Sequence, residues 1–413
     1  MTPVFCCGFE CGVLPANGGH WNPTASAPSI STTTVRTGNR ALRINPSASI
    51  IGASSSAVLA TAVNVFRVAI RFTTLPAADM PLVTAAAGSN LAGAFFKQSD
   101  SKIYAGTKVS SVIVLGATGV AVTTGIWYII DVKSDMTSNP WLIDVQVSGT
   151  ACGQKSTATA GTTTAAFRLG DLDANQSADI FFDDAVWSQT TGDYPIGNGY
   201  VNHFVPTADG THNVAGTGDF QRTLTGTDIL NATTTAFQLV DEVPFEAIVT
   251  DWINMLAPVN ATDYVECIFG PAPGIQIPII GPRAVEVIAG INQAATGNGN
   301  MEIRLNDNGS MGTVYTATGI AGVAVASGQV FKRAHFADPP SAASTWNALS
   351  SGNGAFNNVR VRFGSPAALD VNPDQYFGCI MIEAEFADQL DAAAFGRPAG
   401  QLGQQQMAQL LAQ

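Results

Sequence analysis

The sequence is poor in charged residues. Asp, Glu, Lys and Arg make up 12% of the 413 residues, whereas hydrophobic types make up 46%. An average soluble protein has about 25% charged residues. Intrinsic disorder goes with high charge and few β-branched residues, and a helical bundle would be rich in Glu, Lys, Leu and Arg. The composition therefore argues against both a disordered chain and a helical bundle.

Basic clusters and long apolar runs are also missing. The chain has 19 Lys and Arg against 31 Asp and Glu, a net charge of -12. Sequence-independent nucleic-acid binding works through Lys and Arg, so we expect no nucleic-acid partner. No apolar run reaches the roughly 18 residues that a membrane span needs. Residues 1–7 lack the basic start and apolar core of an export signal, so we expect synthesis in a cytoplasm.

What the chain does contain is many short runs of Val, Ile, Thr and Phe, separated by Gly, Asn, Asp and Pro. Such runs are typical of strands and turns. The segments 65–72, 126–132 and 141–147 alternate apolar and polar residues, as half-buried strands do. We predict an all-β fold of two tandem antiparallel β-sandwich (jelly-roll-like) domains, with a short C-terminal helical tail.

The predicted boundaries follow composition. The first domain spans 1–205, and the stretch that follows it is dense in Gly, Pro, Asn and Asp. The second domain spans 206–387, and a nearly uncharged tail at 388–413 is partly helical. An isolated helix this short is marginal in water. We therefore expect it to dock on a partner through three apolar residues, Met407, Leu410 and Leu411.

Three motifs mark the first domain: Gly-Phe-Glu at 8–10, Arg-x-Gly-x-x-Ala-Leu-Arg-Ile at 36–44, and Phe-Phe-Asp-Asp-Ala-Val-Trp at 181–187. Together they resemble concanavalin A-like, laminin-G-like jelly rolls. The resemblance implies the sandwich fold but no single function, because that scaffold hosts lectins, adhesins, glycosidases and inert spacers. The junction after it is similar to that of tailed-phage virion proteins in which a second β-sandwich follows.

Patterns that carry catalysis are absent from the sequence. There is no Gly-x-Ser-x-Gly elbow, no Walker loop and no Rossmann fingerprint. A glycosidase needs two carboxylates on one concave face, and the usual Glu-x-Asp-x-x-Glu strand does not occur. Glu383 and Glu385 share a strand face, but we expect that face to be half solvated. We predict that the protein is not an enzyme.

Two groups of residues are candidate metal ligands. Cys6, Cys7 and Cys11 form Cys-Cys-x-x-x-Cys, which would hold zinc only if His20 or another residue supplied a fourth ligand. The alternative is that these and the three other cysteines are small buried strand residues, kept reduced. The second group has the spacing of part of a Ca²⁺ loop, although a turn whose side chains cap their own backbone fits it equally. Its members are Asp171, Asp173, Asn175 and Asp183.

The large aromatic residues of the first domain are the candidates for ligand binding. Trp127 and Trp141 alternate with core-like neighbours, so we expect both to be buried. Trp21 lies in a Gly-rich loop between His20 and Asn22, where it can stack on a sugar ring or pack over the end of a sandwich. These three loop residues are the candidate glycan site.

We predict that the protein is a non-catalytic structural component of a bacteriophage particle. It would be tail-associated (an adsorption protein) or capsid-decorating, and assembled in a bacterial cytoplasm. Its partners would be other virion proteins and copies of itself, with a trimer favoured, because sandwich edges tend to associate. We expect no cofactor other than a possible Ca²⁺. We expect contacts at the junction 206–218 and the tail rather than in a cleft. The alternative is a carbohydrate-binding adhesin that recognises a host-surface glycan, and a glycan-degrading enzyme ranks third.

Overall fold

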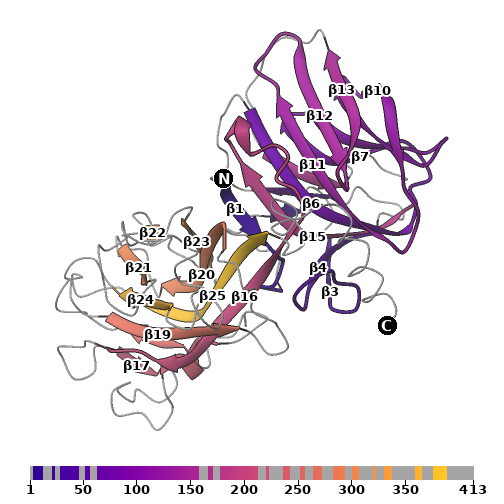
Figure 1. The fold of residues 1–413 in the computed structure, drawn as a ribbon. Helices are drawn as coiled ribbons and strands as arrows, with labels where there is room; N and C mark the ends of the chain where they lie inside the picture. Colours follow the sequence, from indigo (N-terminus) through magenta and orange to yellow (C-terminus); the bar gives the residue numbers. More distant parts are fainter. Residues whose placement is uncertain are drawn as a thin grey trace, which may run out of the picture.

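The computed structural model of the chain describes two sets of β-sheets that follow one another in sequence (Figure 1). Among the described residues there is no helix of the length and apolar character that crossing a bilayer requires. The helical elements described are 3-10 turns, η1 (Thr191–Asp193) and η3 (Ala236–Leu239). The described residues are 3–12, 21–23, 28–45, 52–55, 63–157, 166–170, 177–212, 220–222, 236–241, 252–255, 264–271, 282–293, 300–306, 320–321, 330–336, 359–364 and 375–387.

The first unit has an eight-stranded sheet in the order β13-β12-β11-β6-β15-β4-β3, with β1 paired to β15. All of its strand pairs are antiparallel. The strands are β1 (Pro3–Cys7), β3 (Ser29–Ser31), β4 (Ala41–Ile44), β6 (Val63–Thr74), β11 (Trp127–Asp135), β12 (Trp141–Val147), β13 (Thr150–Thr157) and β15 (Asp179–Ser188).

A seven-stranded sheet in the order β10-β9-β8-β7-β14-β5-β2 faces the first one across a shared core. Phe66 of one sheet stacks on Phe167 of the other, with ring centroids 4.1 Å apart. Buried aromatic rings of this size dominate core energetics. The strands are β2 (Trp21–Pro23), β5 (Gly52–Ser55), β7 (Met80–Ala87), β8 (Asn90–Lys97), β9 (Lys102–Val109), β10 (Val112–Ala121) and β14 (Ala166–Gly170).

The second unit is a ten-stranded antiparallel sheet with its own hydrophobic core. Its longest strand, β25, pairs with β16 and β18 on one side and with β20 on the other. The strands are β16 (Gly199–Asp209), β17 (Phe220–Arg222), β18 (Ile253–Met255), β19 (Tyr264–Pro271), β20 (Ala284–Gln293), β21 (Asn300–Asn306), β22 (Ile320–Ala321), β23 (Val330–Phe336), β24 (Arg360–Gly364) and β25 (Gln375–Ala387).

The prediction of an all-β chain with antiparallel sheets is confirmed. The chain passes from the first set of sheets to the second within residues 189–198, which join β15 to β16 and lie just ahead of the boundary predicted at 205. The predicted tail at 388–413, with Met407, Leu410 and Leu411, lies outside the described residues.

The two units share buried apolar contacts. Cys6 of β1 and Val65 of β6 cluster with Val201 and Ala284 of the second unit. A second cluster joins Cys11 to side chains of β20 and β25. The outer face of β1, β6 and β15 is therefore covered by the second unit at this point instead of being exposed to water.

Candidate functional site

A pocket of about 500 Å³ opens on the outer face of the eight-stranded sheet, close to the segment that leads into the second unit. Alternation along β11 places it there: Ile130 and Val132 point into the core, so Trp127, Ile129 and Asp131 point outward. The pocket is lined by Arg36, Trp127, Ile129, Asp131, Gln146, Ser148, Gly149, Pro195, Gly197 and Asn198.

Trp127 supplies the aromatic part of the lining. It is the first residue of β11, is partly exposed, and lies opposite Arg71 of β6. The polar part comes from the next hairpin and the joining segment, in the form of Gln146, Ser148 and Asn198. Ser148 is already held in place, because its Oγ accepts a hydrogen bond from the Ile129 N–H at 3.2 Å. The pocket thus combines a ring face with fixed hydrogen-bonding groups.

Asp131 connects the sheet to one wall of the pocket, which residues 195–198 of the joining segment form. Its carboxylate accepts a hydrogen bond from the Gly197 N–H at 3.1 Å, and its exposed fraction is 2%. Burial raises the pKa of this carboxyl to about 6, and the Gly197 N–H and the Arg67 charge oppose that rise. The position of Gly197 therefore depends on a buried acid beneath it.

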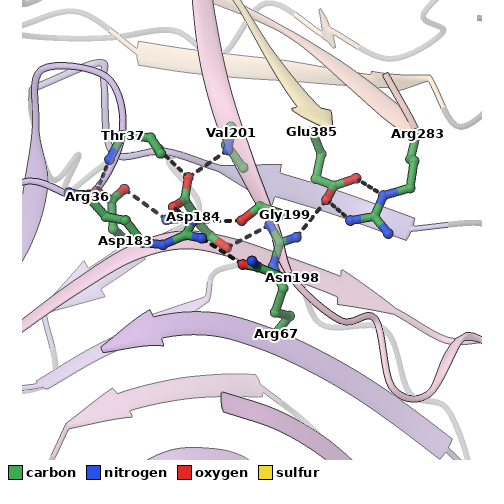
Figure 2. Close-up of polar contacts among 10 residues, drawn as sticks. All are labelled: Arg36, Thr37, Arg67, Asp183, Asp184, Asn198, Gly199, Val201, Arg283 and Glu385. Carbon is green, nitrogen blue, oxygen red and sulfur yellow. Dashed lines mark hydrogen bonds and ion pairs between the residues drawn. The ribbon is translucent and has the colours of Figure 1, made fainter. Parts of the chain in front are cut away.

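Arg36 forms another part of the lining and is firmly held (Figure 2). Its Nη1 donates to Asp184 Oδ2 at 2.5 Å and to the Gly199 carbonyl at 2.7 Å. Its Nη2 donates to Asn198 Oδ1 at 2.7 Å. The positive charge is neutralised by Asp184, whose side chain is fully buried. Charge-assisted bonds of this kind fix geometry better than neutral ones.

A bulge in β15 makes this arrangement possible. Neighbouring strand residues normally point to opposite faces. Here the register shifts between Asp183 and Val186, and Asp184 adopts a φ of +54°. Asp183 accepts from the Arg36 N–H at 2.8 Å, while Asp184 accepts from the Thr37 hydroxyl and the Val201 N–H, each at 2.6 Å. Both carboxylates therefore accept hydrogen bonds from the same loop, at Arg36 and Thr37.

Asp183 was a candidate Ca²⁺ ligand, and its surroundings are those of a structural group. It is fully buried and accepts from three backbone N–H groups, those of Arg36, Thr37 and Asp184. Burial and the neighbouring Asp184 charge raise its pKa. Its proposed co-ligands Asp171, Asp173 and Asn175 lie outside the described residues. Across the described part of the chain, no three His, Cys, Asp or Glu residues are placed to hold a metal.

The proposed sugar contact of Trp21 is wrong. Its exposed fraction is 2%, and its ring packs against Phe5, Phe9 and Phe167 in the core. A ring enclosed on these sides has no face to offer a ligand. His20 lies outside the described residues, and for Asn22 the structure describes only the backbone, in β2.

The cysteines are buried, as the second of the two readings predicted. Cys6, Cys7, Cys11, Cys152, Cys267 and Cys379 are all free and buried. Burial is the main cause of the raised pKa of the Cys6 and Cys7 thiols, and nearby Glu side chains raise it further. Thiols held in this protonated form are poor nucleophiles.

Sequence reasoning missed the pocket, although one signal for it existed. Trp141 is buried as predicted, but the same prediction for Trp127 is wrong, since this residue is partly exposed and lines the pocket. Trp127 and Asp131 are four residues apart on one strand, so their side chains point to the same face of the sheet. Asp is rarely a core residue, so this face was the one that points away from the core. The contribution of Asn198 depends on tertiary structure and has no local signature.

No known family model matches the sequence, and no curated protein matches it. Among solved structures, the chain is similar to a sialidase, with 13% identity, 42% of this chain and 17% of that chain covered, and a TM-score of 0.31. It is also similar to a structure reported with endo-acting O-glycanases of the human gut microbiota (10% identity, 45% and 99% covered, TM-score 0.33). A third is a galectin of Caenorhabditis elegans (7% identity, 35% and 95% covered, TM-score 0.25). The chain spans less than a fifth of that sialidase. Similarities with TM-scores this low carry no functional argument.

Proposed function

We propose that the protein is a non-catalytic carbohydrate-binding protein and that the pocket beside Trp127 holds the sugar. The observation that carries the proposal is a partly exposed Trp next to fixed polar groups in a pocket of about 500 Å³. This volume falls in the usual range for small-molecule sites, roughly 300–1,000 Å³.

The lining matches the chemistry of a saccharide. A sugar ring has an apolar C–H face, which an indole covers, and a rim of hydroxyl groups, which amides and hydroxyls bind. Trp127 supplies the first, and Gln146, Ser148 and Asn198 supply the second. The charge of Arg36 is already compensated by Asp184, so the pocket favours a neutral saccharide over an acidic one.

The same lining favours binding over hydrolysis. A glycosidase needs two carboxyl groups on either side of the scissile bond, about 5–9.5 Å apart. Among the described lining residues Asp131 is the single carboxyl, and it is engaged with the Gly197 N–H. These facts support a protein that holds a glycan without cleaving it.

Trp127→Ala is expected to weaken saccharide binding about tenfold or more, because removal of the indole face costs about 1.4 kcal/mol or more. The measurement is binding of the purified protein to an array of bacterial and animal glycans, followed by titration of each ligand found. Ile126→Ala is the matched control, because Ile126 is the exposed neighbour (53%) and is not in the lining. Equal affinities for wild type and Trp127→Ala would contradict the assignment.

We also propose that the protein acts as a component of a bacteriophage particle. The support is the resemblance of the first domain and its junction to tailed-phage virion proteins. Mass spectrometry of purified particles is expected to find the chain at a copy number set by particle symmetry. Its absence from particles would contradict the assignment to a bacteriophage particle. The carbohydrate site would then be tested separately.

Self-association is the second candidate function, and the edge strand β10 favours it. β10 ends the seven-stranded sheet and contains no charged residue, and Val112 and Val114 are 61% and 43% exposed. Further along, β10 runs beside β13 of the other sheet without pairing to it, so the proposed contact is at Val112 and Val114. Edge strands without charges readily pair with another chain. A second copy of this chain, in a symmetric oligomer such as a trimer, is the proposed occupant.

Val114→Lys is expected to shift the protein from oligomer to monomer, because a charge on the edge opposes pairing. Sedimentation velocity measures the change. Ile126→Lys adds the same charge at another exposed apolar position, outside β10, and is expected to leave the mass unchanged. A wild-type monomer, or an oligomer that Val114→Lys does not alter, would exclude β10 as the interface.

A further inference from the structure

We propose that the second unit sets the shape of the pocket through a ring of hydrogen bonds that starts and ends at the pocket, so that ligand binding and the junction between the units are coupled. The backbone from Ile196 to Asn198 and the bond from Arg36 to Asn198 close the ring. The ligand part of this inference rests on the proposed carbohydrate function. Figure 2 shows most of the ring, which joins Arg36, Asp184, Arg67, Glu385 and Arg283.

The first half of the ring runs from the pocket into the junction. Arg36, in the lining, is paired with Asp184. The backbone carbonyl of Asp184 accepts from Arg67 Nη2 at 3.1 Å. Arg67 has no exposed surface, and its Nη1 donates to Glu385 Oε1 at 2.7 Å. Glu385 belongs to β25, so at this point the ring crosses into the second unit.

The second half returns to the pocket wall. Glu385 Oε2 accepts from Arg283 Nε at 2.7 Å, and Arg283 Nη2 donates to Oε1. The backbone is fixed as well, because the Arg283 N–H donates to the Glu385 carbonyl at 2.7 Å. Arg283 Nη1 then donates to the Ile196 carbonyl at 3.1 Å. Ile196 stands between Pro195 and Gly197, both of which line the pocket.

Packing at the start of β16 holds the ring tightly. A Cβ at Gly199 would collide with Arg67 Nη1 and Arg283 Nη2. The Ile196 side chain is buried among Cys6, Val201 and Ala284. The wall thus touches the second unit through both its carbonyl and its side chain. Neither Arg283 nor Glu385 lines the pocket, so any effect of either residue on ligand affinity must act through the residues between them and the pocket. These are the wall on one side, and Arg67, Asp184 and Arg36 on the other.

Coupling of this kind is reciprocal. If the second unit favours the wall position that binds ligand, bound ligand must favour the junction by the same free energy. Arg283 and Glu385 are therefore positioning residues for the site. A variant that breaks the ring is therefore expected to show faster hydrogen exchange in the wall without ligand, and a lower affinity for the ligand.

The test uses the full chain with Arg283→Met, which removes the bond to the Ile196 carbonyl and leaves Arg67 and Glu385 as a balanced pair. Hydrogen exchange of the ligand-free protein, read on peptides that cover 194–201, is expected to be about tenfold faster than in wild type. The matched control is Arg362→Met, which breaks the ion pair with Glu266 inside the second unit and off the ring. It should leave exchange at 194–201 unchanged.

The ligand arm uses cellotriose, maltotriose and N-acetyllactosamine as neutral probes. For whichever probe binds wild type, Arg283→Met is expected to raise the Kd about tenfold and Arg362→Met to change it less than twofold. Wild-type exchange at 194–201 in a folded Arg283→Met protein would overturn the ring. So would an unchanged Kd. If no saccharide binds wild type, the carbohydrate proposal fails while the exchange arm still decides the ring. Should Arg283→Met not fold, Arg283→Lys keeps the charge and is measured in the same way.

Discussion

Glu385→Ala is expected to lower the free energy of unfolding by about 3–5 kcal/mol, the usual effect of breaking a buried ion pair from one side. The Glu385 carboxylate is fully buried and is the common partner of Arg67 and Arg283, which hold its pKa below the usual value despite burial. Without it, the fully buried Arg67 guanidinium keeps only the Asp184 carbonyl among the bonds described above. Urea unfolding followed by Trp fluorescence measures the loss.

Two controls separate this effect from general damage. The triple variant Arg67→Met, Glu385→Leu and Arg283→Met removes all three charges together and is expected to recover most of the lost stability, because apolar replacement of a buried triad is often neutral or better. Asp144→Ala breaks the partly exposed pair with Lys133 (side chains 22% and 26% exposed) and is expected to cost less than about 1 kcal/mol. A loss below 1 kcal/mol for Glu385→Ala would show that the ring does not hold the units together.

Stability is expected to fall by about 2 kcal/mol between pH 6.5 and 8 because of Glu10. Its Oε1 accepts from the Asn39 and Arg40 N–H groups at 2.8 and 3.1 Å, and its Oε2 lies 3.2 Å from His203 Nδ1. Burial raises the pKa of Glu10 to about 8 and lowers the pKa of His203 to about 4. At pH 6–7 both groups are therefore neutral, and a proton on Glu10 Oε2 would face His203 Nδ1 at 3.2 Å.

The sign follows from proton binding in the folded and unfolded states. Folded Glu10 keeps its proton up to about pH 8, whereas unfolded Glu10 loses it near 4.5, so its contribution falls as pH rises between these values. Unfolded His203 binds a proton below about 6.5 and folded His203 only below about 4, so its contribution rises over that window. The two cancel between about pH 4.5 and 6.5, and above that Glu10 acts alone.

Glu10→Gln tests this directly. The amide can accept the two backbone N–H bonds and donate to His203 Nδ1, so it copies the protonated acid without titrating. We expect the difference in unfolding free energy between wild type and Glu10→Gln to change with pH from 6.5 to 8. Glu266→Gln is the control: hydrogen bonds to the Thr211 N–H, Arg362 and Arg360 lower the pKa of Glu266 below its usual value, so it stays ionised throughout this range. A pH-independent difference for Glu10→Gln would mean that Glu10 is ionised in the folded protein.

The strands could be predicted from the sequence because their evidence is local. Period-two alternation in 141–147 fixes both the strand and its buried face, and β12 follows it with Trp141, Ile143, Val145 and Val147 inward. The same alternation fits the burial of Cys7 in the sandwich core, whereas Cys6 points to the opposite face and is buried because the second unit covers it.

The junction could not be predicted, because its bonds join residues far apart in the sequence. Arg67 and Glu385 are 318 positions apart. We expected the face of Glu383 and Glu385 to be half solvated, and this is wrong because the first unit covers it: both side chains are fully buried. The bulge at Asp184 gives no glycine signal, since the residue at φ +54° is an aspartate. Because the pocket depends on these features, it could not be predicted from the sequence.

A crystal structure of the full chain grown with a saccharide that binds it tests the carbohydrate site at Trp127 most directly. We expect a sugar ring stacked on Trp127, with hydroxyl groups within hydrogen-bond distance of Gln146 and Asn198 and the wall at Pro195–Asn198 unmoved. A saccharide bound elsewhere, with this pocket empty, would contradict it.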